Sequence, residues 1–113
     1  LVVVDGGEIM AAGTPAELIR EHASREVLEA RFGADRNEAA ARTVQAHAGD
    51  GVVHRVEVLP DRVLVYARRA DDLHDVVQRL VDEGALPAPA TTLTRRASLE
   101  DVFLILTGRT LVD

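Results

Sequence analysis

The chain has 113 residues, enough for one folded domain that buries roughly 65 % of the surface exposed by its unfolded form. Hydrophobic residues make up 47 % and charged residues 28 %, a globular balance that excludes an intrinsically disordered chain. The formal net charge is −6, and the basic residues are spread along the sequence, which argues against nucleic-acid binding. Cysteine is absent, which excludes disulfides and thiolate metal sites.

Membrane insertion is not expected from the apolar patterning. The longest strongly apolar runs, residues 1–4 and 102–106, are far shorter than the roughly 20 residues that cross a bilayer as a helix. No basic stretch followed by an apolar leader opens the chain.

The first two dozen residues predict a hairpin followed by a helix. Apolar runs at 1–4 and 8–12 flank Asp5-Gly6-Gly7, and glycine tolerates the positive φ of a tight reversal. In Thr14-Pro15-Ala16-Glu17 a cap hydroxyl, a proline at the first helical position and a carboxylate three residues after the cap follow one another. We therefore expect Thr14 and Glu17 to cap a helix that runs to about His22.

The next two segments predict a strand and a helix. Residues 25–32 alternate, which indicates a half-buried strand, although a helix remains an alternative. The expected inner face holds Leu28, Ala30 and Phe32, and the outer face holds Glu29 and Arg31. Residues 35–38 offer a cap for a helix over 39–48, with a weak apolar stripe.

A second hairpin, a helix and a last strand are expected from the following pattern. Even positions from Val52 to Val58 share one face, and Val63, Val65 and Ala67 align with them after the Pro60-Asp61 turn. Asp71 and Asp72 can cap a helix that ends at Gly84. Its apolar stripe comprises Leu73, Val76, Val77, Leu80 and Val81. After two prolines, residues 90–96 are β-branched enough to form a strand.

From residue 25 onward the predicted order is strand, helix, strand, strand, helix, strand, then one added helix. This is the split βαβ arrangement of ferredoxin-like domains, so the fold class is α+β.

The added helix is the best candidate for an interface. Ser98 caps it, and one stripe holds Leu99, Val102, Phe103 and Leu106 at spacings i, i+3, i+4 and i+7. Gly108 fits a left-handed C-cap, and Arg109 lies near the negative end of the helix dipole. The stripe can pack on the domain's own sheet or on another subunit, and both alternatives remain open.

Two terminal motifs carry a family resemblance. Residues 98–109, Ser-Leu-Glu-Asp-Val-Phe-Leu-Ile-Leu-Thr-Gly-Arg, resemble the closing signature of drug-exporter ATPases of the daunorubicin-resistance type. Residues 3–9 and 12–18 resemble the last strands of an ABC-transporter nucleotide-binding domain. The resemblance implies that residues 1–24 are the tail of that domain and 25–113 a C-terminal accessory domain.

The same resemblance implies a role. The accessory domain would stabilise the homodimer of an ATPase subunit or couple that subunit to an integral-membrane permease. The full-length parent would use ATP and Mg²⁺ to drive export, at the cytoplasmic face of a bacterial membrane. The chain has no lysine and no phosphate-binding loop, so no catalytic or cofactor residue is assigned and the fragment is not expected to be an enzyme.

Three groups of residues have a functional and a plainer interpretation. The histidines, at 22, 47, 54 and 74, lack metal-ligand spacing and are expected in solvent or in the core. Asp71, Asp72 and Asp75 fit helix capping better than cation binding. Arg95 and Arg96 could bind phosphate or an acidic partner, but paired arginines at a strand end more often form a solvated edge.

A function of a different class is the alternative. Ferredoxin-like domains can pair around a ligand, so a small-molecule sensing module is a second hypothesis that rests on analogy of fold. A pocket with convergent polar groups would favour it.

Overall fold

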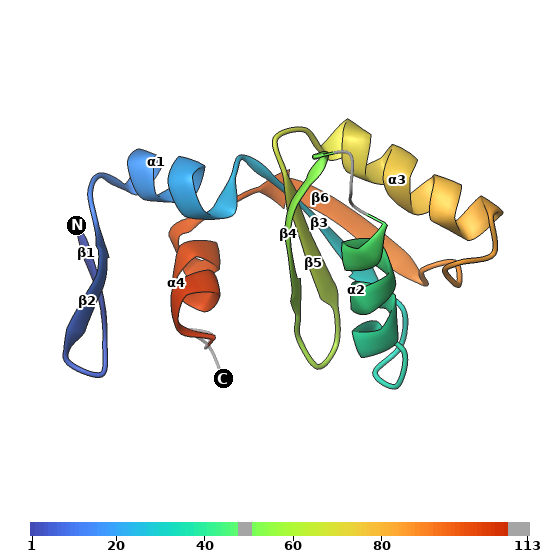
Figure 1. The fold of residues 1–113 in the computed structure, drawn as a ribbon, viewed down its shortest axis with the longest axis horizontal. Helices are drawn as coiled ribbons and strands as arrows, with labels where there is room; N and C mark the ends of the chain where they lie inside the picture. The colour runs from blue at the N-terminus through green and yellow to red at the C-terminus, as the bar shows by residue number, and fades with distance from the viewer. Residues whose placement is uncertain (48–50, 109–113) are drawn as a thin grey trace.

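The computed structural model of the chain describes residues 1–47 and 51–108. The described chain is α+β, with two antiparallel sheets (Figure 1). The elements, in chain order, are β1 (Val2–Asp5), β2 (Glu8–Ala12), α1 (Pro15–Leu18), the π-helix η1 (Ile19–Ala23), β3 (Glu26–Arg31), α2 (Asn37–Ala46), β4 (Val53–Val58), β5 (Val63–Ala67), α3 (Ala70–Asp82), β6 (Thr91–Arg96) and α4 (Leu99–Thr107).

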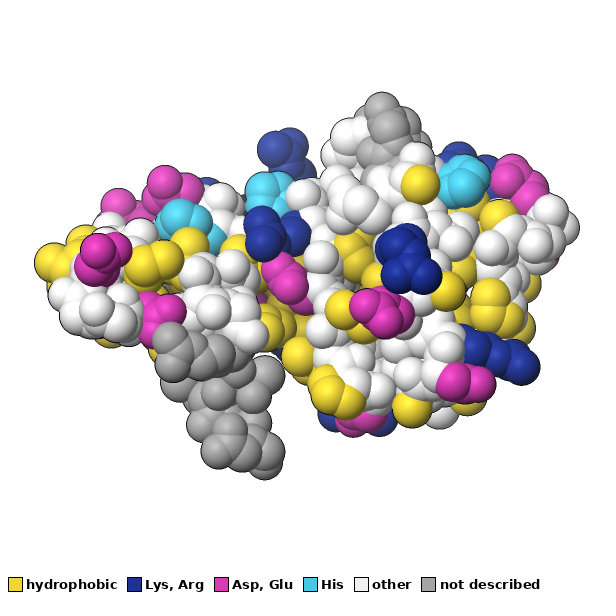
Figure 2. Space-filling model, turned by 60° about the horizontal axis from the view of Figure 1, so that its bottom comes forward, with side chains coloured by type: hydrophobic (Ala, Val, Ile, Leu, Met, Phe, Trp, Pro, Cys, Tyr) yellow, Lys and Arg dark blue, Asp and Glu magenta, His cyan; other side chains and the backbone are white. Residues whose placement is uncertain are grey.

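The N-terminal hairpin forms as predicted and lies at one end of the molecule (Figure 1). Its turn places Gly6 and Gly7 at φ values of 60° and 81°, the left-handed region that the tight reversal requires. The hairpin is largely uncovered, since the Ile9 side chain is 69 % exposed. Figure 2 shows hydrophobic side chains gathered at this end.

The helix predicted to follow the hairpin is present in two parts. The Thr14 hydroxyl accepts the Glu17 N–H at 3.2 Å, and the Glu17 carboxylate accepts the Thr14 N–H at 3.2 Å. These reciprocal bonds satisfy two amides that a helix start leaves unpaired. The turn continues as a π-helix to Ala23, where the chain enters β3.

The larger sheet has four strands in the order β4-β5-β3-β6, and every neighbouring pair is antiparallel. Helices α2 and α3 cover one face, and α4 and η1 lie at the other (Figure 1). The two central strands, β3 and β5, are therefore covered on both faces. This explains why all five residues of β5 are buried.

The core between the sheet and helices α2 and α3 is made by the predicted apolar stripes. From α3, Leu73, Val76, Val77 and Leu80 are buried there, and Val81 packs at the margin. From the sheet, Leu28, Ala30, Val63, Val65 and Ala67 face them. Each fully buried aliphatic side chain stabilises this layer by about 1.5 to 3 kcal/mol relative to its exposed state.

The prediction that β3 is half-buried is wrong. Glu29, expected on a solvent face, is only 7 % exposed, and its neighbour Val27 is fully buried. The reason is the second layer, in which Val27 packs with Leu18, Tyr66 and Val102. A long-range layer of this kind leaves no local signal in the alternation of residues 25–32.

The predicted side-chain caps of α2 and α3 are also wrong. Helix α2 begins at Asn37 without a capping side chain; the buried Asn37 amide oxygen instead accepts the Phe32 N–H at 3.0 Å. In α3 the first free amide, Ala70 N–H, donates at 2.9 Å to the Glu26 carboxylate of β3. The Glu26 carboxylate, from a strand distant in the sequence, thus caps the helix start that Asp71 and Asp72 were expected to cap.

Strand β4 departs from strict alternation. Its register with β5 shifts between Val53 and Arg55, so Val53 joins the core and His54 is exposed. Val56 packs on the core as expected, but Val58 is exposed. One irregularity inserted into a strand moves the side chains before it to the other face.

Candidate contact site at the closing helix

The closing helix is fixed to the sheet by a carboxylate with several partners. Asp101, in the first turn of α4, accepts hydrogen bonds from Tyr66 Oη at 2.7 Å and from the Ser98 backbone N–H at 2.7 Å. Arg95 Nη1 and Nη2 donate to its two carboxylate oxygens at 2.7 and 2.8 Å. The Asp101 side chain is only 3 % exposed, so these bonds compensate for the removal of the charge from water.

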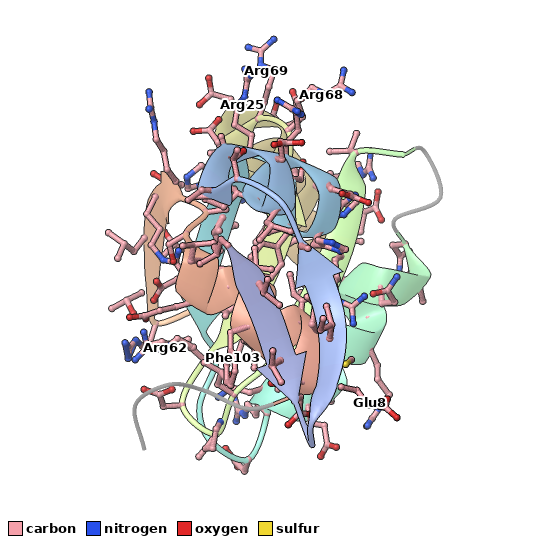
Figure 3. The ribbon with its side chains drawn as sticks, turned by 90° about the vertical axis from the view of Figure 1, so that its left-hand side faces the viewer. Glu8, Arg25, Arg62, Arg68, Arg69 and Phe103 are labelled. Carbon is pink, nitrogen blue, oxygen red and sulfur yellow. The ribbon has the colours of Figure 1, made fainter. Side chains whose placement is uncertain are left out.

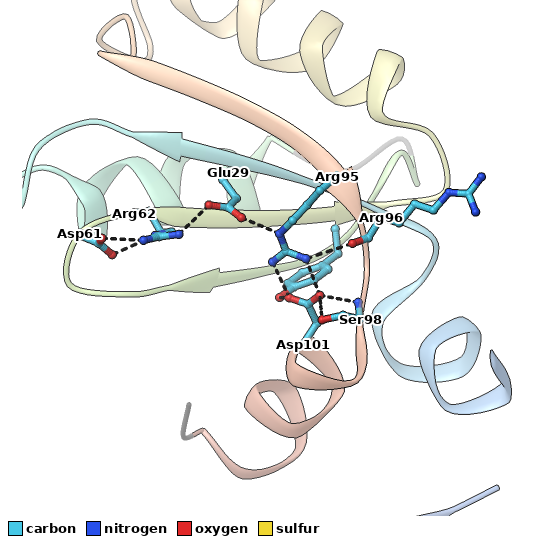
Figure 4. A network of polar contacts seen from close by, with 8 residues as sticks. Glu29, Asp61, Arg62, Arg95, Arg96, Ser98 and Asp101 are labelled. Atoms are coloured by element: carbon cyan, nitrogen blue, oxygen red, sulfur yellow. Dashed lines mark hydrogen bonds and ion pairs between the residues drawn. The ribbon is translucent and has the colours of Figure 1, made fainter. Parts of the chain in front are cut away.

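A second carboxylate extends the cluster across the sheet (Figure 4). Glu29 Oε2 accepts from Arg95 Nε at 2.6 Å, and Glu29 Oε1 accepts from Arg62 Nη1 at 2.8 Å. Arg62 also pairs with Asp61 in the β4–β5 turn, at 2.8 Å. We call Tyr66, Asp101, Arg95, Glu29 and Arg62 the polar cluster.

The ionisation of the polar cluster follows from these contacts. Burial alone raises the pKa of Asp101, but the hydrogen bonds from Arg95, Ser98 and Tyr66 outweigh burial and leave this pKa below its ordinary value. The bond to Asp101 raises the pKa of Arg95, and burial raises the pKa of the Tyr66 hydroxyl. Asp101 is therefore an anion, and Tyr66 a neutral donor, across the physiological pH range.

The expectation that Arg95 and Arg96 form a solvated edge is wrong for the first of them. Arg95 points over the sheet into the polar cluster, whereas Arg96 points away from it (Figure 4). Alternation along β6 puts the two side chains on opposite faces. Sequence reasoning missed Tyr66, Glu29 and Arg62, because the residues that they contact within the polar cluster lie more than thirty positions away.

A groove of about 570 Å³ opens beside the polar cluster, between α4 and the sheet. Its wall combines polar and charged side chains with apolar ones. The polar and charged residues are Glu29, Arg62, Arg95, Arg96, Ser98, Glu100 and Asp101. Leu59, Leu64 and Leu104 supply the apolar part. Among the described residues every buried side-chain polar atom has a hydrogen-bond partner. The buried polar groups of the wall are therefore already bonded within the chain, whereas Arg96 and Glu100 are exposed.

The predicted interface residues do not share one environment. Val102 is fully buried in the chain's own core, with Leu99 and Leu106 packed at its edge. Leu104 and Ile105, outside the predicted stripe, also pack there, because α4 packs against η1 and the second face of the sheet. Phe103, labelled in Figure 3, is half-buried. In the described part of the chain it belongs to neither core cluster.

The end of α4 has the expected glycine conformation. Gly108 has φ 75°, and its N–H donates at 2.7 Å to the Leu104 carbonyl. Such a left-handed residue satisfies a carbonyl that the last helical turn leaves unpaired. Arg109, also named as an interface candidate, lies outside the described residues.

The remaining sequence candidates form no metal-binding group in the described part of the chain, although His54 Nε2 lies 3.3 Å from the His22 carbonyl oxygen. His47, His54 and His74 are exposed, and His22 is half-buried. In the described part of the chain no three or more acidic or histidine side chains form a group that could hold a metal ion. Of the helices in residues 1–47 and 51–108, none is long and apolar enough to cross a bilayer.

The sequence matches a known family over most of the folded unit. Residues 40–108 match the family described as "Nodulation factor export protein NodI, C-terminal domain". The chain belongs to this family. It is the C-terminal domain of an ABC transporter ATP-binding protein, as the terminal motifs indicated.

Two curated relatives extend the match. The chain is 36 % identical over its whole length to "Nod factor export ATP-binding protein I" of Ralstonia nicotianae, and covers 33 % of it. It is 35 % identical over 96 % of its length to the protein of that name from Mesorhizobium japonicum, and covers 28 % of it. The chain thus spans about a third of the length of these relatives. No solved structure matches it.

These relatives refine the sequence resemblance. An ABC-transporter ATP-binding origin is confirmed, but the names of the relatives specify Nod factor export, so drug export is not supported.

Proposed function

We propose that residues 25–113 are an accessory domain through which an exporter ATPase subunit makes contacts, with residues 1–24 as the tail of its nucleotide-binding domain. The proposed roles are stabilisation of the ATPase homodimer and coupling to the integral-membrane permease. The relatives, about three times as long and named ATP-binding proteins, support a parent that binds and hydrolyses ATP with Mg²⁺. Such a subunit would work at the cytoplasmic face of a bacterial membrane.

The observation that carries this proposal is the position of Phe103 on an anchored helix. The polar cluster fixes the first turn of α4 to the sheet through Asp101. Phe103 follows two residues later and, among residues 1–47 and 51–108, belongs to neither core cluster. A rigid element that presents a half-buried aromatic ring is suited to a protein contact, because aromatic side chains are enriched among the residues that dominate interface energetics.

The proposed fold of residues 26–96 is ferredoxin-like. The strand order β4-β5-β3-β6, the antiparallel pairing and the two helices on one face support it. In this fold the second face of the sheet stays available, and α4 and η1 occupy part of it here.

Deletion of residues 25–113 from the full-length subunit tests the function. We expect the truncated subunit to lose dimer formation or permease association, and with it export. ATP hydrolysis, dimer formation and export that all survive the deletion would contradict the proposal.

A small-molecule sensor is the second candidate, favoured by the groove of about 570 Å³ with polar and apolar walls. Its charged groups Glu29, Arg62, Arg95 and Asp101 already bond to one another, which leaves Arg96 and Glu100 as the exposed charged groups for a ligand. A rise in melting temperature with an exported compound, lost in Arg62→Met, would support sensing; unchanged melting would reject it.

A further inference from the structure

Four exposed arginines from separate parts of the sequence lie at one end of the larger sheet. Arg25 precedes β3, Arg68 and Arg69 follow β5, and Arg96 ends β6. Figure 3 shows Arg25, Arg68 and Arg69 together, pointing away from the ribbon. We call these four residues the arginine surface.

Backbone pairing fixes the spacing of the arginine surface. The Arg25 N–H donates to the Ala67 carbonyl at 3.3 Å, and the Ala97 N–H donates to the Arg25 carbonyl at 3.0 Å. Arg25 is thus bonded on one side to the residue before Arg68 and on the other to the residue after Arg96. Neighbouring strands are about 4.8 Å apart, so the backbone positions of Arg25, Arg68 and Arg96 lie on adjacent strand ends.

The charges of the arginine surface are not neutralised within the described chain. None of the four guanidinium groups has an ion pair there with an acidic side chain. The nearby Glu26 carboxylate instead accepts the Ala70 N–H. Asp71 and Asp72 follow in the first turn of α3, but neither forms an ion pair with these arginines. Arg62 and Arg95, in contrast, are fully engaged in the polar cluster.

We propose that the arginine surface docks an acidic segment of the permease. This inference rests on the proposed function, and it assigns the permease contact to one face. The chain carries a formal net charge of −6, which repels negative partners in general. The arginine surface is a local positive region within this negative chain, and it therefore directs a negative partner to one place. Guanidinium groups bind carboxylates through two parallel hydrogen bonds, which suits a segment rich in Asp and Glu.

The composition of the surroundings favours a protein partner over a lipid surface. Interfacial helices that insert into membranes combine basic side chains with apolar ones that enter the bilayer. The exposed large hydrophobic residues of the described chain are Leu1, Val2, Val4, Ile9, Met10, Val58 and Leu93. None of them belongs to the segment ends that carry the arginine surface.

Co-purification of the full-length subunit with its permease tests the docking proposal. We expect the amount of permease that co-purifies with the double variant Arg25→Glu, Arg68→Glu to fall roughly tenfold relative to the wild type. The matched control is Arg42→Glu, Arg79→Glu, which reverses two exposed arginines on α2 and α3 and should retain wild-type association. Urea unfolding of both variants verifies that each remains folded, and Arg25→Ala, Arg68→Ala provides a milder change.

The outcomes separate this proposal from the proposed function. The variants of the arginine surface could co-purify with the permease while the subunit without residues 25–113 does not. In that case the proposed function is supported, and the arginine surface is not the permease contact. If the deletion also keeps dimer, permease and export, both proposals fall. Binding of the wild-type subunit alone to phosphatidylserine vesicles, lost in Arg25→Glu, Arg68→Glu, would replace the permease by the lipid surface and overturn the proposal.

Discussion

The Tyr66 hydroxyl donates a 2.7 Å hydrogen bond to the Asp101 carboxylate, and so joins a central strand to the first turn of the closing helix. The two residues are 35 positions apart, and both are buried. The contact makes α4 part of the sheet's second layer. The position of Phe103, and with it the proposed interface, depends on this attachment.

Replacement of Tyr66 by phenylalanine removes this bond and retains the ring. We expect a loss of about 1.5 to 3 kcal/mol in the free energy of unfolding, because the acceptor is ionised. Urea unfolding measures the loss. The control is Thr43→Val, which removes the exposed bond from Thr43 Oγ1 to the Ala39 carbonyl and should change stability much less. Equal effects of the two substitutions would show that the Tyr66 bond has no special role.

The Asp101 carboxylate gives stability a defined pH dependence. Its pKa in the folded chain lies below the ordinary value near 3.9, so the folded state favours the anion. The contribution is fully present above pH of about 4 and is lost as the pH falls through the lower, folded-state pKa. In Asp101→Asn we expect a loss of about 3 kcal/mol at neutral pH that shrinks in acid. A stability difference independent of pH would contradict this assignment.

Arginine and lysine should not be interchangeable at position 95. Arg95 reaches Glu29 through Nε and Asp101 through both terminal nitrogens, a geometry that a single ammonium group does not reproduce. We expect Arg95→Lys to lower the free energy of unfolding by about 2 kcal/mol. The adjacent Arg96→Lys is the matched control, with an effect within about 0.5 kcal/mol. The reverse order of the two effects would be incompatible with the polar cluster.

The sequence predicted the elements that depend on local patterns. The Thr14 capping motif, the apolar stripe of α3 and the turn at Gly6-Gly7 each depend on contacts or spacings of at most four positions, and the structure has all three. The polar cluster could not be predicted in this way. Glu29, Tyr66 and Arg95 look like ordinary strand residues until the sheet and α4 bring them together. The same applies to the arginine surface, whose members are scattered along the sequence.

The proposed boundary between residues 24 and 25 has a structural consequence. Leu18 and Ala23, on the N-terminal side, are fully buried in the same cluster as Val27 and Tyr66. A shortened chain that begins at Arg25 would expose that cluster. We expect Leu18→Ala to cost about 2 to 5 kcal/mol, and the shortened chain to be less stable still.

Urea unfolding of the 1–113 and 25–113 chains measures this dependence. Equal stability of the two would show that residues 1–24 do not contribute to the domain. The hairpin provides an internal control, since Ile9→Ala removes an exposed side chain and should change stability little.

Light scattering of the full-length subunit with ATP, over a concentration series, tests the central claim most directly. The wild type should form a dimer. The Phe103→Asp dimer should be weaker, so that it is already dissociated at concentrations at which the wild type is still a dimer, while the fold is retained. The reason is that a charge would enter an aromatic contact between subunits. Phe103→Leu, which keeps an apolar side chain, should weaken the dimer less. A dimer of unchanged strength in Phe103→Asp, or an unfolded subunit, would place Phe103 in the domain's own packing and contradict the interface.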